Sequence, residues 1–548
     1  MMYVFFFIIL FSLIGYGLLV KNFLNIQTYN FGILGLLGIT FAALISYSSA
    51  IFFKHGYLFN SVFIIIGILL FINSLKKIDN LKTEFIYFFS IFFILLIFIS
   101  VGKNHDDFPY YHFPYISVIT EYSHPIGFGQ LNNGFRSPSS IFFISSMFYL
   151  PYVNVYLFHI TPALILCFSN LVLLSLITNK KIFHKIKFIN FLSLISLIFI
   201  NIFFYRLAEH GTDRSGMILI ILSIIFLLYL INNDNYEIYK NENFDLFKIF
   251  AILICFVISI KPSYLINLSF FLVLLSHLNT RIIFKKLFFS TSFIYCFLFI
   301  LFTVFYTFIN SSCLVFPLAF TCFENVSWAI DKEHISGVKL WFELWSKAGA
   351  TPHNVVPLEE RASYVDGFTW LPNWFNLYFF NKVSDFILGL FTLCLVVIFS
   401  FRKLSFSIKK NNIKLIFVYS IIFIFLIEWF FYHPQLRYGG YHLIALILLI
   451  PTSLILSQTK IDYKNYYKKS SILILITVII FLYRNFDRLG NEYEQYKYNP
   501  LINSNYKFIG ADKKYHLRYN NHMKEHIKSY ETINIFGKKI VNTTFQEK

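Results

Sequence analysis

Long apolar stretches recur along the whole chain and alternate with short polar segments. Many of these stretches reach about 17–25 residues, the length with which a helix crosses roughly 30 Å of hydrocarbon. We therefore predict an all-α, polytopic integral membrane protein with about fourteen transmembrane helices. The expected spans are 2–20, 31–53, 58–74, 84–101, 151–177, 188–205, 216–232, 247–260, 264–278, 287–309, 384–401, 413–431, 441–457 and 470–483.

Three segments need separate treatment. The first, MMYVFFFIILFSLIGYGLLV, lacks a basic n-region and an A-x-A site, so we expect a retained span rather than a signal peptide. The segment SSIFFISSMFYL at 139–150 is too short to span and predicts a juxtamembrane or re-entrant helix. The Lys261–Pro262 step divides the apolar run 247–278, and only two spans there keep all basic loops on one side.

The basic residues of the loops define the topology. Counting the spans places five groups on the same side, which the positive-inside rule identifies as the cytoplasm. These groups are Lys76, Lys77 and Lys82; Lys180, Lys181, Lys185 and Lys187; Arg281, Lys285 and Lys286; Arg402, Lys403, Lys409 and Lys410; and Lys460, Lys464, Lys468 and Lys469.

The other polar segments then fall on the extracytoplasmic side. They are the loops 102–138, 206–216, 310–383 and 432–441 and a polar tail at 484–548. A transporter tends to carry ionisable groups inside its spans and to show repeated halves. This chain has few charges within the spans and no detectable repeat. We therefore expect its chemistry on the outer surface.

Composition supports the membrane assignment and argues against nucleic-acid binding. The chain is 57% hydrophobic and 14% charged, with a mean hydropathy of +0.64. Its net charge is +18. A nucleic-acid-binding protein would gather basic residues on one folded face, whereas here they are spread over short loops between apolar runs. The positive charge is thus read as a topology signal, and no nucleic-acid partner is expected.

The stretch KNHDDFPYYHFPY at 103–115 carries the first candidate chemistry. Asp106 and Asp107 follow the fourth span within a few residues, so both are held close to the membrane surface. A carboxylate there suits a general base acting on an acceptor, or a ligand of a divalent cation. The alternative is an ordinary solvated loop charge.

Aromatic residues and histidines accompany this carboxylate pair. Tyr110, Tyr111 and His112 suit packing against a sugar or headgroup, although tyrosines at this depth also form the usual interfacial belt. The spacing of His105, Asp107 and His112 matches no zinc signature, so no zinc site is predicted, and a divalent cation at the carboxylates stays open as a cofactor.

Other charged residues on the predicted outer face complete the candidate site. Glu209 and Asp213 lie in the next outer loop and form a second acidic position. Lys261 at the Pro-marked break and Arg437 in a short loop suit the binding of a lipid-linked phosphate. The alternatives are ordinary loop charges and, for the cations, snorkelling to the interface.

The long outer loop 310–383 is rich in amphipathic aromatic residues. It holds five of the six tryptophans, Trp429 being the exception, which suits a loop that lies on the membrane surface and covers a headgroup or sugar. Cys313 and Cys322 share this loop in a compartment that permits oxidation, so a disulfide between them is one expectation.

An acidic motif directly after a span, followed by juxtamembrane helical material, resembles the first outer loop of GT-C superfamily glycosyltransferases such as protein mannosyltransferases and aminoarabinose transferases. DDFPYYHFPYISVITEYSHPIGFGQLNNGFRSPSS is also similar to uncharacterised bacterial membrane proteins of this superfamily. The chain differs from these families in three spans before the core, and it lacks the WWD-type signature of oligosaccharyltransferases.

The resemblance implies a domain organisation. Residues 1–83 would be N-terminal helices, 84–309 a GT-C-like catalytic core with first outer loop 102–138, 310–383 the loop that covers the site, 384–483 C-terminal helices and 484–548 an outer tail. Asp106 or Asp107 would match the first catalytic position of the family, and Glu209 or Asp213 the second.

The resemblance also implies a function. A sugar would pass from a polyprenyl-phosphate-linked donor to an extracytoplasmic glycan, lipid or protein acceptor in cell-envelope glycan synthesis. The protein would lie in the inner membrane of a bacterium with its site facing the periplasm or the outside. Two alternatives stay open: an O-antigen polymerase or ligase, which would depend on outer Arg and His residues, and a flippase or transporter for lipid-linked glycans.

Overall fold

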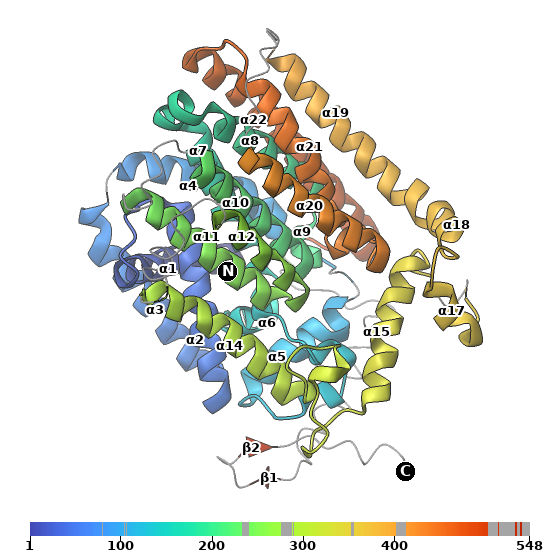
Figure 1. Ribbon diagram of the computed structural model, residues 1–548. Coiled ribbons are helices and arrows are strands. Elements are labelled where there is room, and N and C mark those ends of the chain that lie inside the picture. Colours follow the sequence, from blue (N-terminus) through green and yellow to red (C-terminus); the bar gives the residue numbers. More distant parts are fainter. Residues whose placement is uncertain are drawn as a thin grey trace.

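The computed structural model describes residues 1–78, 80–103, 105, 107–232, 241–275, 288, 290–351, 356–401, 413–501, 513, 532–533 and 538–539. Within these ranges the protein is an all-α, polytopic membrane protein (Figure 1). Eleven described helices are long and apolar enough to cross a membrane. The predicted fold class is thereby confirmed.

The helices of the first half are α1 (Met2–Phe23), α2 (Phe31–Phe52), α3 (Tyr57–Ser74), α4 (Leu81–Ile99), α5 (Phe113–Glu121), α6 (Ser140–Ser146), α7 (Ile160–Thr178), α8 (Lys180–Phe203), α9 (Leu207–His210), α10 (Thr212–Asn232) and α11 (Asn241–Ile260). The second half contains α12 (Phe270–Leu275), α14 (Thr291–Ser311), α15 (Lys332–Lys347), α17 (Arg361–Val365), α18 (Leu371–Trp374), α19 (Ser384–Ser400), α20 (Ile413–Tyr432), α21 (Gly440–Ser457) and α22 (Tyr463–Tyr496). Two short strands, β1 (Thr532–Ile533) and β2 (Lys538–Lys539), pair antiparallel near the C-terminus.

Three predicted spans differ in detail from the helices that form. The span expected at 151–177 begins only at Ile160, because turns occupy the preceding residues. The span expected at 264–278 falls on the 3-10 helix η6 (Pro262–Ser269) and on α12, and its last three residues lie outside the described ranges. The span at 470–483 is the middle of α22, which continues to Tyr496 and so includes the start of the expected polar tail.

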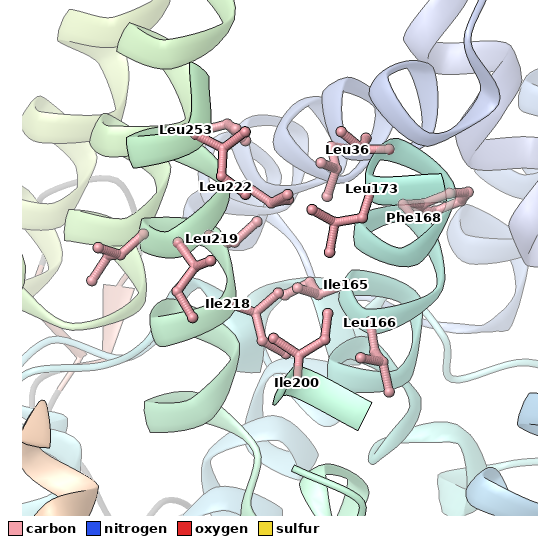
Figure 2. Packing of buried hydrophobic residues seen from close by; sticks show 14 of the residues in the cluster. Leu36, Ile165, Leu166, Phe168, Leu173, Ile200, Ile218, Leu219, Leu222 and Leu253 are labelled. Atoms are coloured by element: carbon pink, nitrogen blue, oxygen red, sulfur yellow. The ribbon is translucent and has the colours of Figure 1, made fainter. Parts of the chain in front are cut away.

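The buried centre of the bundle is formed by α2, α7, α8, α10 and α11. Between 78% and 89% of the apolar stretch of α2, α7, α8 and α10 is buried, against 28% for α3 and α20. Helices buried all round belong inside the bundle, and those buried on one side belong at its edge. Figure 2 shows the contact region, with labelled side chains Leu36, Ile165, Leu166, Phe168, Leu173, Ile200, Ile218, Leu219, Leu222 and Leu253.

The lysine-rich connections meet at one end of the bundle. Lys187 donates from Nζ to the carbonyl of Thr459 at 3.0 Å, and the Tyr463 hydroxyl donates to the carbonyl of Thr178 at 2.5 Å. In Figure 1 this end lies toward the top of the view, whereas α5, α6 and α15 lie toward the bottom. The basic groups at 281–286 and 402–410 lie outside the described residues.

Glycines allow α1 to pack closely against α2. A Cβ on Gly38 would stand 1.8 Å from the carbonyl oxygen of Leu13, and one on Gly17 would stand 1.8 Å from that of Leu34. Backbones approach this closely only where no side chain intervenes, which is the small-residue packing typical of membrane helices.

Gly38→Ala is therefore expected to destabilise the protein, because the new methyl group meets backbone that cannot rotate away. The cost should be about 1–3 kcal/mol, measured as a lower unfolding temperature in detergent. Gly490→Ala in α22 is the control, because nothing lies within 4 Å of its added Cβ. Equal effects of the two substitutions would contradict the packing argument.

Candidate functional site

The first outer loop presents Asp107 at the start of an unusual helix. After α4 ends at Ile99, Asp107 precedes the π-helical turn η2 (Phe108–His112), which leads directly into α5. Pro109 fits the first turn of this helix, where its missing N–H costs no hydrogen bond. Short π-helical segments occur frequently at functional sites. The turn holds Asp107 at the end of a helix rather than on a free loop.

Asp107 faces a cation from the other end of the sequence. Its Oδ2 lies 3.5 Å from Nη1 of Arg437, and each side chain is 37% exposed. The same oxygen lies 3.5 Å from Nδ1 of His105. Both charged groups of the Asp107–Arg437 pair are thus accessible as well as near one another.

A second ion pair joins the outer ends of α10 and α11. Nζ of Lys261, just after α11, donates to Oδ1 of Asp213 in the first turn of α10 at 2.6 Å. The Tyr264 hydroxyl donates to the backbone carbonyl of Asp213 at 2.9 Å. Gly216 makes room for the Tyr264 ring, since an added Cβ would stand 2.4 Å from Cε2.

Tyr111 and His112 are buried side chains that the charges of both carboxylates reach. Burial of the imidazole lowers the pKa of His112 to about 4, although Asp107 and Asp213 both act in the opposite direction. Burial also raises the pKa of Tyr111 well above its ordinary value, and the same two carboxylates add to this shift. Both side chains are therefore neutral near pH 7. Their sensitivity to both charges places Asp107 and Asp213 in one electrostatic neighbourhood.

The loop that carries Arg437 is anchored by the long outer loop. Nε1 of Trp374 donates to the carbonyl of Pro434 at 2.7 Å, and Nε2 of Gln435 donates to the carbonyl of Trp345 at 2.9 Å. The Tyr378 hydroxyl accepts from the backbone N–H of Leu436 at 2.9 Å. The tryptophan-rich segment thus acts on the site by holding the loop around residue 436 in place.

The electrostatic environment around Arg437 is mixed. Burial lowers the pKa of Arg437, but Tyr438, Asp213 and Asp107 outweigh it, so this pKa lies above its ordinary value. The guanidinium also donates to the Tyr438 hydroxyl at 2.7 Å. Nζ of Lys261 lies 4.6 Å from the centre of the same tyrosine ring. Two cations therefore flank one aromatic ring.

The pKa of His433 is sensitive to further positive charges near Arg437. Burial lowers the pKa of His433 to about 4, and the charges of Lys261, Lys347 and Lys339 lower it as well. Nζ of Lys347 donates to Oε1 of Glu343 at 2.6 Å and to the carbonyl of Val365 at 2.7 Å. Lys339 is exposed on α15. The face of the bundle next to Arg437 is thus rich in cations.

The structure brings most of the sequence-predicted residues together. Asp107, Asp213, Lys261 and Arg437 gather around Tyr111 and His112, whereas Tyr110 is partly exposed and its carbonyl accepts from Nδ2 of Asn132 at 3.4 Å. Asp106 lies outside the described residues, and so does the side chain of Glu209. Cys313 and Cys322 are joined by a disulfide in the long outer loop.

The carboxylates and histidines in the described part of the chain can be compared with the arrangement that a metal ion needs. No group of three or more His, Cys, Asp or Glu side chains there is arranged to hold a metal ion. Each of the two described carboxylates of the site instead faces a basic side chain.

Sequence reasoning missed several residues that shape the site. Tyr264 and Tyr438 contact its charged groups, and His442 lies buried near Tyr264 with its ring centre 6.2 Å from that of the tyrosine. The run LRYGGYH, which places aromatic and basic residues around two glycines at a helix start, was the available signal for Tyr438 and His442.

The C-terminal helix α22 holds the start of the Asp107 loop. Oε2 of Glu492 accepts from the backbone N–H of Gly102 at 2.7 Å, and Nη2 of Arg488 donates to the carbonyl of Ser100 at 2.9 Å. Arg488 and Glu492 form an ion pair at 3.5 Å, and both side chains are more than nine-tenths buried. A buried charge pair of α22 therefore fixes the backbone that leads to Asp107.

Glu492→Gln should loosen this attachment, because a neutral amide oxygen accepts the Gly102 N–H less strongly than a carboxylate does. We expect faster deuterium uptake at Gly102, about 3–10-fold, in hydrogen-exchange mass spectrometry. Uptake at the opposite end, around Asn179, should not change. An unchanged rate at Gly102 would mean that Glu492 does not hold this loop.

The Asp213–Lys261 pair should show energetic coupling. We expect Asp213→Asn and Lys261→Met each to lower the unfolding temperature, and the double variant to lose less than the sum, with a coupling of about 0.5–3 kcal/mol. The control cycle uses Glu324 and Lys332, a pair at 3.3 Å whose side chains are 60% and 42% exposed. Its coupling should stay below about 1 kcal/mol. Equal coupling in both cycles would contradict a special role for Asp213–Lys261.

Comparison with known proteins gives a family but no characterised relative. No curated protein and no solved structure matches the chain. Residues 1–444 match a family model described as a domain of unknown function, DUF8201. The matched region contains Asp107, Asp213, Lys261 and Arg437, whereas α22 lies beyond it. The match covers most of the 548 residues, and the chain therefore belongs to the DUF8201 family.

Proposed function

We propose that this protein is a membrane glycosyltransferase of the GT-C type that transfers a sugar from a polyprenyl-phosphate-linked donor to an extracytoplasmic acceptor. The observation that supports this best is the meeting of Asp107, Asp213, Lys261 and Arg437 at one end of the bundle. These residues come from four segments that the sequence separates by up to 330 positions, yet two carboxylates and two cations share one neighbourhood.

The two cations suit a phosphate leaving group. As the bond between the anomeric carbon and the phosphate oxygen breaks, its electron pair passes to the lipid phosphate, whose negative charge grows. Arg437 would bind this phosphate through its planar guanidinium. Lys261, Lys339 and His433 stand nearby, and the first two add positive charge to the same face. The negative phosphate of a lipid-linked donor would thus face positively charged side chains.

The carboxylate beside them suits a general base. The acceptor hydroxyl would attack the anomeric carbon while its proton passes to the Asp107 carboxylate, so that a new glycosidic bond replaces the bond to phosphate. Asp106 remains the other candidate for this role from the same motif. Asp213 would act by holding Lys261 in position, and His112, buried and neutral, would pack beneath the site.

The position of the site relative to the basic loops supports its orientation. The Lys187–Thr459 contact marks one end of the bundle, and the Asp107–Arg437 pair lies among the opposite helix ends. By the positive-inside rule the lysine-rich end would be cytoplasmic. The site would then face the periplasm or the outside of a bacterial inner membrane, where lipid-linked sugars for the cell envelope are used.

Asp107→Asn is expected to lower glycan transfer by about 10²–10⁴-fold, the usual contribution of a general base. Transfer should be measured in membranes of cells that lack the wild-type protein, with equal amounts of inserted variant, as the change in size of the envelope glycan. Asp366→Asn is the matched control, since Asp366 is an exposed outer carboxylate outside the site. It should retain full transfer.

Asp106→Asn and Arg437→Ala complete this comparison. If Asp106→Asn and Asp107→Asn, both correctly inserted, retained full transfer, the glycosyltransferase proposal would be wrong. Loss in Arg437→Ala with full activity in both Asp variants would instead indicate a polymerase or ligase. Lipid-linked glycan that crosses reconstituted vesicles without any covalent transfer would indicate a flippase.

A further inference from the structure

A second arginine lies on the outer face, away from the charged groups described above. Arg136 follows the turn that the short helices η3 (Phe128–Gln130) and η4 (Asn133–Phe135) form in the first outer loop. It is only 6% exposed. Asp107 and Asp213 pair with Arg437 and Lys261, respectively, whereas Arg136 contacts the carbonyl of Gly129 and the Phe316 ring. Arg136 is therefore distinct from the Asp107–Arg437 neighbourhood.

Arg136 lacks the partners that a buried guanidinium needs. Its Nε donates to the carbonyl of Gly129 at 3.1 Å, but in the described part of the chain Nη1 has no acceptor, and no carboxylate forms an ion pair with it. The hydroxyl of the neighbouring Ser137 is also buried without a partner. A buried charge without a counter-ion destabilises the folded protein. An anion bound at Arg136 would therefore stabilise it.

Two other outer segments meet Arg136. Its guanidinium carbon lies 5.6 Å from the centre of the Phe316 ring, which belongs to the disulfide hairpin closed by Cys313 and Cys322. From the first turn of α15, the exposed His334 is close enough that the charge of Arg136, after burial, lowers the pKa of its imidazole. The disulfide hairpin thus contacts Arg136, and the start of α15 lies within reach of its charge.

Gln130 fixes this arrangement. Its Nε2 donates to the carbonyls of Trp328 at 3.0 Å and of Ala329 at 2.9 Å, which ties the start of the long loop to the turn beside Arg136. Gly129 permits the close contact, because a Cβ there would stand 2.4 Å from the carbonyl oxygen of Asn310. Hydrogen bonds from Gln130 and close packing at Gly129 therefore fix the loop segments around Arg136 relative to one another.

The neighbouring surface is suited to lipid. Ile294, Phe297, Leu301 and Phe305 form an exposed apolar stripe along α14, at the spacing of one helix face. The disulfide hairpin continues this stripe: Phe323 packs on Phe308 of α14 with ring centres 5.6 Å apart, and Phe320 is 84% exposed. Since α14 is a candidate membrane span, the hairpin at its end would lie near the boundary between acyl chains and headgroups.

We propose that Arg136, together with the neighbouring Ser137, binds the phosphate group of an anionic lipid at the outer end of α14, beside the disulfide hairpin. The guanidinium supplies paired N–H donors for phosphate oxygens, and the hairpin packs against the acyl chains. This site is separate from the proposed donor-phosphate site at Arg437. It does not depend on the proposed sugar transfer, because lipid binding can be measured without it.

The test uses the full-length protein, purified in a neutral detergent, with dioctanoyl phosphatidic acid as the probe. We expect this lipid to raise the unfolding temperature of the wild type, and Arg136→Gln to weaken its binding by at least about tenfold. Lys332→Gln is the matched control: it removes one outer charge from an exposed residue at the start of α15 that pairs with Glu324. It should bind like the wild type.

Behaviour without lipid separates a binding role from a structural one. Arg136→Gln removes an uncompensated buried charge, so its unfolding temperature without lipid should equal or exceed that of the wild type. A lower temperature together with unchanged lipid binding would overturn the proposal. If Arg136→Gln does not fold, Arg136→Lys is used instead, because this variant keeps the positive charge but loses the planar guanidinium. Full affinity of Arg136→Lys for the lipid would also overturn the proposal.

Inorganic phosphate distinguishes the source of the group. No stabilisation by inorganic phosphate at the concentration at which the lipid acts would assign the site to lipid-borne phosphate. Equal stabilisation, abolished by Arg136→Gln, would support a phosphate site and assign it to free phosphate. Dioctanoylglycerol, which lacks the phosphate, should have no effect, and a stabilisation equal to that by phosphatidic acid would overturn the proposal.

Discussion

The ion pair between Asp213 and Lys261 is the contact on which the outer end of the bundle depends. The two charges stand at the ends of neighbouring helices, and both side chains are mostly buried, so either charge alone would be costly. Their contact at 2.6 Å therefore fixes how α10 and α11 end relative to one another. Tyr264, which bonds the backbone of Asp213, and Tyr438, which lies under Lys261, take their positions from this pair.

A second constraint acts on the segment that carries Asp107. In a membrane protein the backbone between spans is free to move unless side chains hold it, and here the holding groups come from α22. Glu492 and Arg488 bond the backbone at Gly102 and Ser100, and the π-helical turn then leads into α5. Asp107 is thus fixed on both sides. The site needs a helix that lies beyond the residues shared with the DUF8201 family.

Topology was readable from the sequence because it rests on signals that are local. Apolar length gives the spans, and counting them from one basic loop to the next placed Asp107, Asp213, Lys261 and Arg437 on a common side. Contacts over long distances leave no such signal. Nothing in the residues around Glu492 indicates Gly102 as its partner. The kink at Ile186, near the start of α8, could not be predicted either, because no proline marks it in the sequence.

The two outer arginines show how the surroundings of one side chain decide what it can bind. Arg437 has a carboxylate at 3.5 Å and is more than one-third exposed, so an incoming phosphate must compete with Asp107 for the guanidinium. In the proposed sugar transfer, this competition would free the carboxylate when the phosphate arrives, at the stage that needs a base. Arg136 has no described carboxylate and is almost fully buried, so an anion that reaches it meets no competitor. The Arg437 guanidinium, which can exchange one anionic partner for another, therefore suits the proposed turnover. The Arg136 guanidinium, which has no described carboxylate partner, suits lasting attachment of the proposed lipid.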